Sequence, residues 1–60
     1  MALYENASGD SIKTEGMKYT VTRNNVEQNF DLSHWAKNAE DHIDGDIWAG
    51  YYLGFKKVEA

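Results

Sequence analysis

An alternating stretch at residues 17–30 constrains the fold more than any other part of the sequence. Residues 17–23 alternate and are rich in β-branched and aromatic side chains, which is typical of a strand. Asn24 and Asn25 can adopt the positive φ angles of a two-residue turn. Residues 26–30 would then return as a second strand. The sequence therefore predicts a β-hairpin over 17–30.

A helix is predicted to follow this hairpin, over about residues 31–44. Asp31 has a side chain that can accept a hydrogen bond from a free backbone N–H in the first turn of a helix. Phe30 and Trp35 flank it at the spacing of a hydrophobic staple, and Gly45 would end the helix. Apolar residues recur at helical spacing on one side: Leu32, Trp35, Ala36, Ala39 and Ile43.

Residues 47–57 fit two structures. In a strand, Trp48 and Tyr52 would lie on the face opposite the core, whereas a helix would place the apolar residues differently. Gly50 and Gly54 would each cost a helix about 1 kcal/mol, and aromatic residues are enriched in strands. We therefore expect a third strand over 47–57. Together these elements predict an α+β fold in which a small antiparallel sheet packs on one helix.

Residues 1–16 are the least periodic part of the chain, and the Asn, Ser, Gly and Asp residues at 6–10 favour a loop. Either a short strand at Leu3–Glu5 or a loosely ordered arm over 1–16 fits this region. The 60 residues are too few for more than one domain. With no Cys and no Pro, eight aromatic residues must supply much of the core.

The chain begins with Met, and it has neither a basic and apolar leader nor an apolar run of about 20 residues. We therefore expect a complete, short gene product without a signal peptide or a membrane span. The lack of Cys fits the reducing environment of the cytoplasm.

Negative charge is concentrated between residues 27 and 46. This segment holds six acids and one base and carries a net charge of −5, whereas the rest of the chain has four acids and five bases. An acidic protein is unsuited to direct binding of nucleic acid or anionic lipid. A field of one sign speeds association with oppositely charged partners by about 10- to 10³-fold. The six acids are Glu27, Asp31, Glu40, Asp41, Asp44 and Asp46.

Two further observations make this region a candidate contact surface. Glu40, Asp41 and Asp44 would lie near the C-terminus of the predicted helix, where the helix dipole disfavours each exposed carboxylate by about 0.3–1 kcal/mol. A conflict of this kind, between carboxylates and the helix dipole, indicates that these residues serve function rather than stability. Trp48 and Tyr52 follow closely, and aromatic rings beside carboxylates suit a basic partner. The candidate partner-binding residues are the six acids together with Trp48 and Tyr52.

The sequence has no recognisable catalytic or metal-binding motif. The acidic run at 41–46 lacks the order of Asp, Gly and Glu that defines an EF-hand. His34 and His42 are eight residues apart rather than four, and no Cys completes a zinc site. A chain of this length can hardly enclose a substrate pocket. We expect no enzyme activity, no metal and no other cofactor.

In length, acidity, absence of Cys and α+β pattern, the chain resembles the small phage-encoded inhibitors of bacterial defence, anti-CRISPR proteins in particular. The six acids carry this resemblance as a surface rather than as a motif. Some members of that class mimic DNA on the effector complex. The resemblance implies a non-enzymatic inhibitor in the cytoplasm of a bacterial host. It would bind the basic surface of a nucleic-acid-binding protein, for example a CRISPR effector complex, and block DNA access.

The alternative is a small structural or regulatory module that homodimerises through the aromatic segment at residues 47–55. The sequence leaves the choice between a monomer and a homodimer open.

Overall fold

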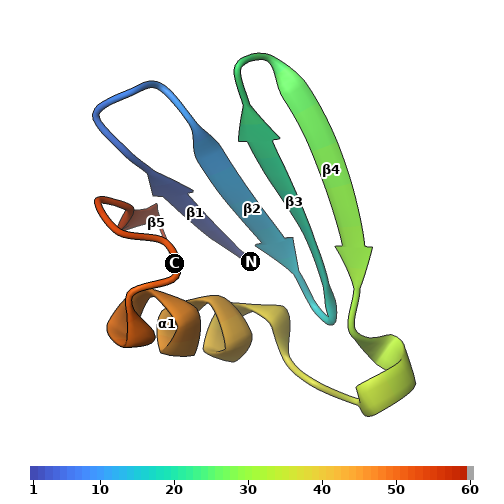
Figure 1. The fold of residues 1–60 in the computed structure, drawn as a ribbon. Helices are drawn as coiled ribbons and strands as arrows, with labels where there is room; N and C mark the ends of the chain where they lie inside the picture. Colours follow the sequence, from blue (N-terminus) through green and yellow to red (C-terminus); the bar gives the residue numbers. More distant parts are fainter. Residues whose placement is uncertain (60) are drawn as a thin grey trace.

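The computed structural model describes residues 1–59, which form a five-stranded antiparallel sheet and one α-helix (Figure 1). The spatial order of the strands is β4-β3-β2-β1-β5. The strands are β1 (Ala2–Glu5), β2 (Ser11–Glu15), β3 (Lys18–Arg23), β4 (Val26–Asp31) and β5 (Lys56–Glu59). Between β4 and β5 come a 3-10 helix, η1 (Ser33–Trp35), and the α-helix α1 (Ala39–Ala49). The predicted α+β class, with a small sheet packed on one helix, is confirmed.

The predicted hairpin at residues 17–30 corresponds to β3 and β4. Asn24 and Asn25 have φ angles of 53° and 64°, as in the type I′ turn that matches the twist of two antiparallel strands. The pairing places Tyr19 opposite Phe30, and their rings stack with centroids 4.8 Å apart. The local pattern therefore fixed both the turn and the register.

Residues 1–16 form a second hairpin, so the alternative of a loosely ordered arm is wrong. β1 pairs with β2, with Tyr4 opposite Ile12. The turn between them is held by the side chain of Asn6, whose Oδ1 accepts hydrogen bonds from the backbone N–H groups of Ser8 (3.0 Å) and Asp10 (2.9 Å). The β1 strand has only four residues, too few for a clear alternating pattern.

The helix predicted over 31–44 is displaced in the structure. Asp31 does accept a hydrogen bond from a backbone N–H, that of Ser33 at 2.8 Å, but it stabilises only η1. Ala36 then adopts a left-handed conformation with φ of 52°, which interrupts the helix. α1 begins after Asn38, whose Oδ1 accepts from the N–H of Asp41 at 3.1 Å.

The strand predicted over 47–57 is wrong, because α1 runs past Gly45 and ends at Ala49. Gly50 has a φ of 94°, and its N–H bonds to the carbonyls of the last turn, so this glycine and not Gly45 ends the helix. Only Lys56–Glu59 is a strand, and it adds to the far side of β1. The intrinsic cost of Gly45 is outweighed because Ile43 is fully buried one turn from the helix start.

The core lies between one face of the sheet and α1. Figure 1 shows α1 lying beside the sheet. His42 of α1 lies beside Tyr19 of β3, and Asp44 of α1 beside Tyr4 of β1. Thr14 is the buried polar residue of the sheet, and its hydroxyl accepts from the N–H of Ala2 at 2.9 Å. The buried apolar residues are Ala2, Tyr4, Ile12, Tyr19, Val21, Leu32, Ala39, Ile43 and Phe55, with Ile47 and Tyr52 packed against them.

Candidate functional site

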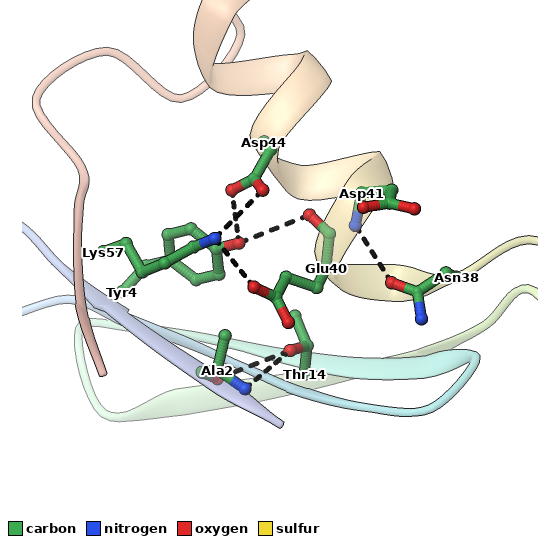
Figure 2. A network of polar contacts seen from close by, with 8 residues as sticks. All are labelled: Ala2, Tyr4, Thr14, Asn38, Glu40, Asp41, Asp44 and Lys57. Atoms are coloured by element: carbon green, nitrogen blue, oxygen red, sulfur yellow. Dashed lines mark hydrogen bonds and ion pairs between the residues drawn. The ribbon is translucent and has the colours of Figure 1, made fainter. Parts of the chain in front are cut away.

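Two of the predicted contact acids belong to a polar cluster that joins α1 to the sheet (Figure 2). The Tyr4 side chain is 0% exposed, and its hydroxyl donates to Asp44 at 2.6 Å, with the backbone carbonyl of Glu40 at 3.3 Å. The Nζ of Lys57, on β5, lies 2.7 Å from a Glu40 carboxylate oxygen and 3.0 Å from one of Asp44. The same ammonium is 5.6 Å from the centre of the Tyr4 ring.

The contacts within this cluster shift the pKa values of three of its side chains. The hydrogen bond from Tyr4, and then the contact with Lys57, hold the pKa of Asp44 below its ordinary value of 3.8. Burial, and then the hydrogen bond to Asp44, raise the pKa of Tyr4 above 10.0. The hydrogen bonds to Glu40 and Asp44 raise the pKa of Lys57 above 10.5. Tyr4 therefore stays neutral and Lys57 charged near neutral pH, as suits a structural cluster.

The cluster changes what the acidic run can do. Glu40 and Asp44 share Lys57, so neither is a free carboxylate that awaits a cation from a partner. Glu40 and Asp41 also lie in the first turn of α1 rather than at its C-terminus. Carboxylates there are favoured by the helix dipole. The predicted conflict at a helix C-terminus is therefore wrong for Glu40 and Asp41 and no longer argues for function.

Two acids of α1 remain outside the cluster. Asp41 is exposed, and no ion pair to it occurs among residues 1–59. The carboxylate of Asp46 lies 3.3 Å from Nε2 of His42, one turn earlier on the helix. An imidazole offers a full countercharge only when it is protonated. Asp41 is thus the helix acid most available to a partner.

Glu27 and Asp31 do not join the acids of the helix. Both lie on β4, where Glu27 pairs with Thr22 and Asp31 with Lys18 of β3. By alternation these residues point to the face of the sheet opposite α1, since Val21 and Tyr19 point toward the core. The six acids therefore form two separate groups on opposite sides of the sheet.

The end of α1 and the turn after it expose three large apolar side chains. The exposed fractions are 91% for Trp48, 78% for Tyr51 and 81% for Leu53. Trp48 follows Asp44 by four residues and Asp41 by seven, so it lies on the same side of the helix as both acids. We call the surface formed by Asp41, Asp44, Trp48, Tyr51 and Leu53 the α1 surface.

Tyr52, the other predicted aromatic contact, is half-buried. Its ring packs edge-on against Phe55 with centroids 5.8 Å apart, and the guanidinium of Arg23 lies 5.5 Å from its centre. Tyr52 therefore packs against the core and does not project into solvent as Trp48 does.

The sequence did not point to Lys57, Tyr51 or Leu53. Lys57 is 13 residues from Asp44 and 17 from Glu40, so no local pattern links them. In the strand predicted over 47–57, alternation would place Tyr51 and Leu53 on the core face, opposite Trp48 and Tyr52. A helix that ends at Gly50 would have moved both into an exposed turn.

A shallow hollow of about 930 Å³ lies at one end of the sheet. Its walls include Leu3, Lys13, Lys18 and Asn29, and of the predicted contact residues only Asp31 borders it. Among residues 1–59, no three His, Cys, Asp or Glu side chains gather into a group that could hold a metal ion. Nor does the described chain contain a helix with the length and apolar character needed to cross a membrane.

Comparison of the chain with models of protein families, with curated proteins and with solved structures gave no match.

Proposed function

We propose that the protein is a small, non-enzymatic inhibitor of the anti-CRISPR type, which binds a basic protein surface through the α1 surface. The observation that supports this most is the exposure of Trp48, at 91%. A Trp side chain that is exposed to water contributes almost no burial energy to the stability of the fold. Trp is also the residue type most enriched among those that dominate binding energy at protein interfaces.

The charge around Trp48 favours a basic partner. The four carboxylates of α1 and the single ammonium of Lys57 leave three negative charges beside the apolar side chains. Negative charge steers the approach of a positively charged surface, and aromatic side chains then provide buried contact area. Strongly basic protein surfaces are typical of nucleic-acid-binding proteins. The proposed action is therefore to occupy such a surface in the bacterial cytoplasm and to block access of DNA.

Self-association through Trp48, Tyr51 and Leu53 is the second candidate, since the same exposure supports it. In a symmetric contact each copy would bring its own Asp41, unpaired within residues 1–59, and the net negative charge of its α1, to the other. Like charges that meet at an interface cost binding energy. The charge pattern therefore favours a different, basic protein over a second copy at this surface.

The proposal is tested with variants that leave the Tyr4 cluster intact. Reversal of Glu40 or Asp44 to Lys would place a cation beside Lys57 and disturb the fold, so we choose Asp41→Lys and Trp48→Ser. Glu59→Lys is the matched control, because it changes charge equally on an exposed strand residue outside the α1 surface. Each protein is immobilised and exposed to bacterial lysate, and captured proteins are quantified with and without competing duplex DNA.

We expect the wild type and Glu59→Lys to capture the same nucleic-acid-binding protein, and duplex DNA to displace it. Trp48→Ser should weaken capture by about 30-fold or more, since loss of a dominant interface side chain costs about 2 kcal/mol or more. Equal capture by wild type and Trp48→Ser, or capture that DNA leaves unchanged, would refute the proposal. A dimer of the protein that Trp48→Ser dissociates would support the second candidate instead.

A further inference from the structure

The β4 strand forms one edge of the sheet, and all six of its residues are exposed. Antiparallel ladders alternate between residues that bond to the neighbouring strand and residues whose backbone groups point away from it. The N–H of Leu32 bonds to the carbonyl of Met17 at 2.7 Å, which fixes this alternation. Residues 28 and 30 therefore bond to β3, whereas Glu27 and Asn29 direct their N–H and C=O groups outward from the edge.

This edge is less protected against pairing than the opposite edge. Proteins block edges with charged side chains, Lys above all, and with Pro, bulges or short strands, and of these β4 has only the carboxylates of Glu27 and Asp31. The opposite edge has three of them: β5 has four residues, contains Lys56 and Lys57, and has a register shift in its pairing with β1. β4 has six residues, pairs with β3 without a shift, and contains neither Lys nor Pro.

The β4 edge also leaves apolar area uncovered on the side of the sheet that faces α1. Val26 is 62% exposed and Phe30 is 39% exposed, although Phe30 stacks on Tyr19. The two residues are four apart on one strand, so both side chains project to the same face. A strand added to this edge would cover both.

We propose that β4 pairs with β4 of a second copy of this chain, antiparallel, about a twofold axis that passes beside Gln28. In this register Val26 of one copy faces Phe30 of the other, and Gln28 faces Gln28. Glu27 faces Asn29, and these two exchange the outward backbone hydrogen bonds. The result is a continuous ten-stranded sheet with both α1 helices on the same side, since a twofold axis perpendicular to a sheet keeps its faces.

The other symmetric registers are less favourable. An axis beside Asn29 would set Glu27 against Asp31 of the other copy, and an axis beside Glu27 would set the two Glu27 carboxylates against each other. Like charges directly opposite on neighbouring strands are destabilising. An axis beside Phe30 would leave Val26 without a partner and carry the pairing into η1. Only the axis beside Gln28 gives both apolar residues of β4, Val26 and Phe30, an apolar partner and avoids opposed acids.

The first experiment compares Glu27→Pro with Glu27→Thr by sedimentation at a series of concentrations. Both variants remove the carboxylate, but only Pro removes the outward N–H, and Pro is tolerated on an edge where that group bonds to no neighbour. The wild type and Glu27→Thr should dimerise with similar dissociation constants. Glu27→Pro should raise the dissociation constant about tenfold or more, because each dimer loses two backbone hydrogen bonds. Circular dichroism shows whether each variant is folded.

The second experiment uses the residue that faces itself, and it does not depend on Pro. Gln28→Glu alone and Gln28→Lys alone should each dimerise about fivefold more weakly than the wild type, and an equal mixture of the two should regain the dimer. A wild type that stays monomeric at every concentration would overturn the proposal. A dimer that is equally stable in Glu27→Pro and Glu27→Thr, or a mixture that behaves like the separate Gln28 variants, would do so as well.

Discussion

Tyr4 is the residue that ties the two layers of the molecule together. Its ring lies in the core, while its hydroxyl reaches the helix and donates to Asp44 at 2.6 Å. A buried hydroxyl without a partner is costly, so the position of Asp44 on α1 and that of Tyr4 on β1 depend on each other. The hydrogen bond therefore sets how α1 lies along the sheet.

Removal of this hydroxyl should be measurable as a loss of stability. Tyr4→Phe keeps the ring and deletes only the hydrogen bond, and we expect the free energy of unfolding to fall by about 1–2 kcal/mol, since the acceptor is charged but partly hydrated. Tyr51→Phe is the control, because Tyr51 is 78% exposed, and it should change stability by about 0.5 kcal/mol or less. Urea unfolding measures both. Equal stability of the two variants would show that the Tyr4 hydroxyl is not a structural contact.

The lowered pKa of Asp44 predicts a dependence of stability on acid. Because the pKa is lower in the folded state than the ordinary value of 3.8, the charged form stabilises the fold above that value. This contribution is lost as the pH falls below 3.8 toward the folded pKa. Asp44→Asn lacks it, so the gap in unfolding free energy between wild type and variant should be constant near neutral pH and shrink in acid. A gap that stays constant down to the acid limb would contradict the shift.

At the scale of the elements, the residues at the two ends of α1 determine where this short helix begins and ends. Asn38 caps the first turn, Glu40 and Asp41 lie where the dipole favours acids, and Gly50 ends the helix in a left-handed conformation. The same kinds of signal occur earlier in the sequence, at Asp31 and Gly45. Both sets are locally acceptable, and the structure uses the second.

Two glycine substitutions distinguish these alternatives. Gly45 lies inside α1 with open space where the methyl group of an alanine would project, so Gly45→Ala should stabilise the protein by about 0.5–1 kcal/mol. Gly50 has a φ of 94°, which an L side chain rarely adopts, so Gly50→Ala should destabilise by about 1 kcal/mol or more. Thermal unfolding measures the order of the two melting temperatures. The opposite order would place the end of the helix at Gly45.

The hairpins, unlike the helix, are specified by residues close together in the sequence. The turn at Asn24 and Asn25 has positive φ at both residues, and strand pairing follows from that turn. Gly16, with a φ of 60°, plays the same part at the first position of the turn between β2 and β3. A two-residue turn specifies its register within a few residues, which is why the sequence could predict the β3–β4 pairing.

At the scale of the whole molecule, the last strand and the first strand lie side by side in the sheet. β5 adds to β1, and Lys57 brings a cation between Glu40 and Asp44, which would otherwise repel each other one turn apart on α1. The two ends of the chain and the helix thus stabilise one another, although most of the sequence separates them.

A charge deletion tests this long-range contact. Lys57→Met keeps the length of the side chain and should lower the free energy of unfolding only slightly, because Lys57 and its two carboxylate partners are all partly exposed. The difference should shrink in about 1 M salt, where charges are screened within about 3 Å. Lys56→Met is the matched control on the other face of β5 and should have less effect. A loss that is the same for both variants and at every salt concentration would argue against the ion pairs.

The candidate site was predictable in part. The sequence located Asp41 and Trp48, because an acidic run followed by aromatic residues is visible in any conformation. Counting charge along the sequence also placed Glu27 and Asp31 in one group with these residues, because the count takes no account of position in the fold. The sheet separates these two acids from α1, and only the pairing of β4 with β3 shows which face they occupy.

By itself the sequence determined the α+β class and the hairpin at residues 17–30, because those signals lie within a few residues of one another. The tertiary structure decided where α1 begins and ends, which acids are paired, and that Tyr51 and Leu53 lie in water. The reason is one of magnitude. Local helix preferences differ by about 1 kcal/mol or less for residues other than Pro, whereas full burial of a side chain such as Ile43 contributes about 1.5–3 kcal/mol. Which residues can be buried together depends on strands from both ends of the chain.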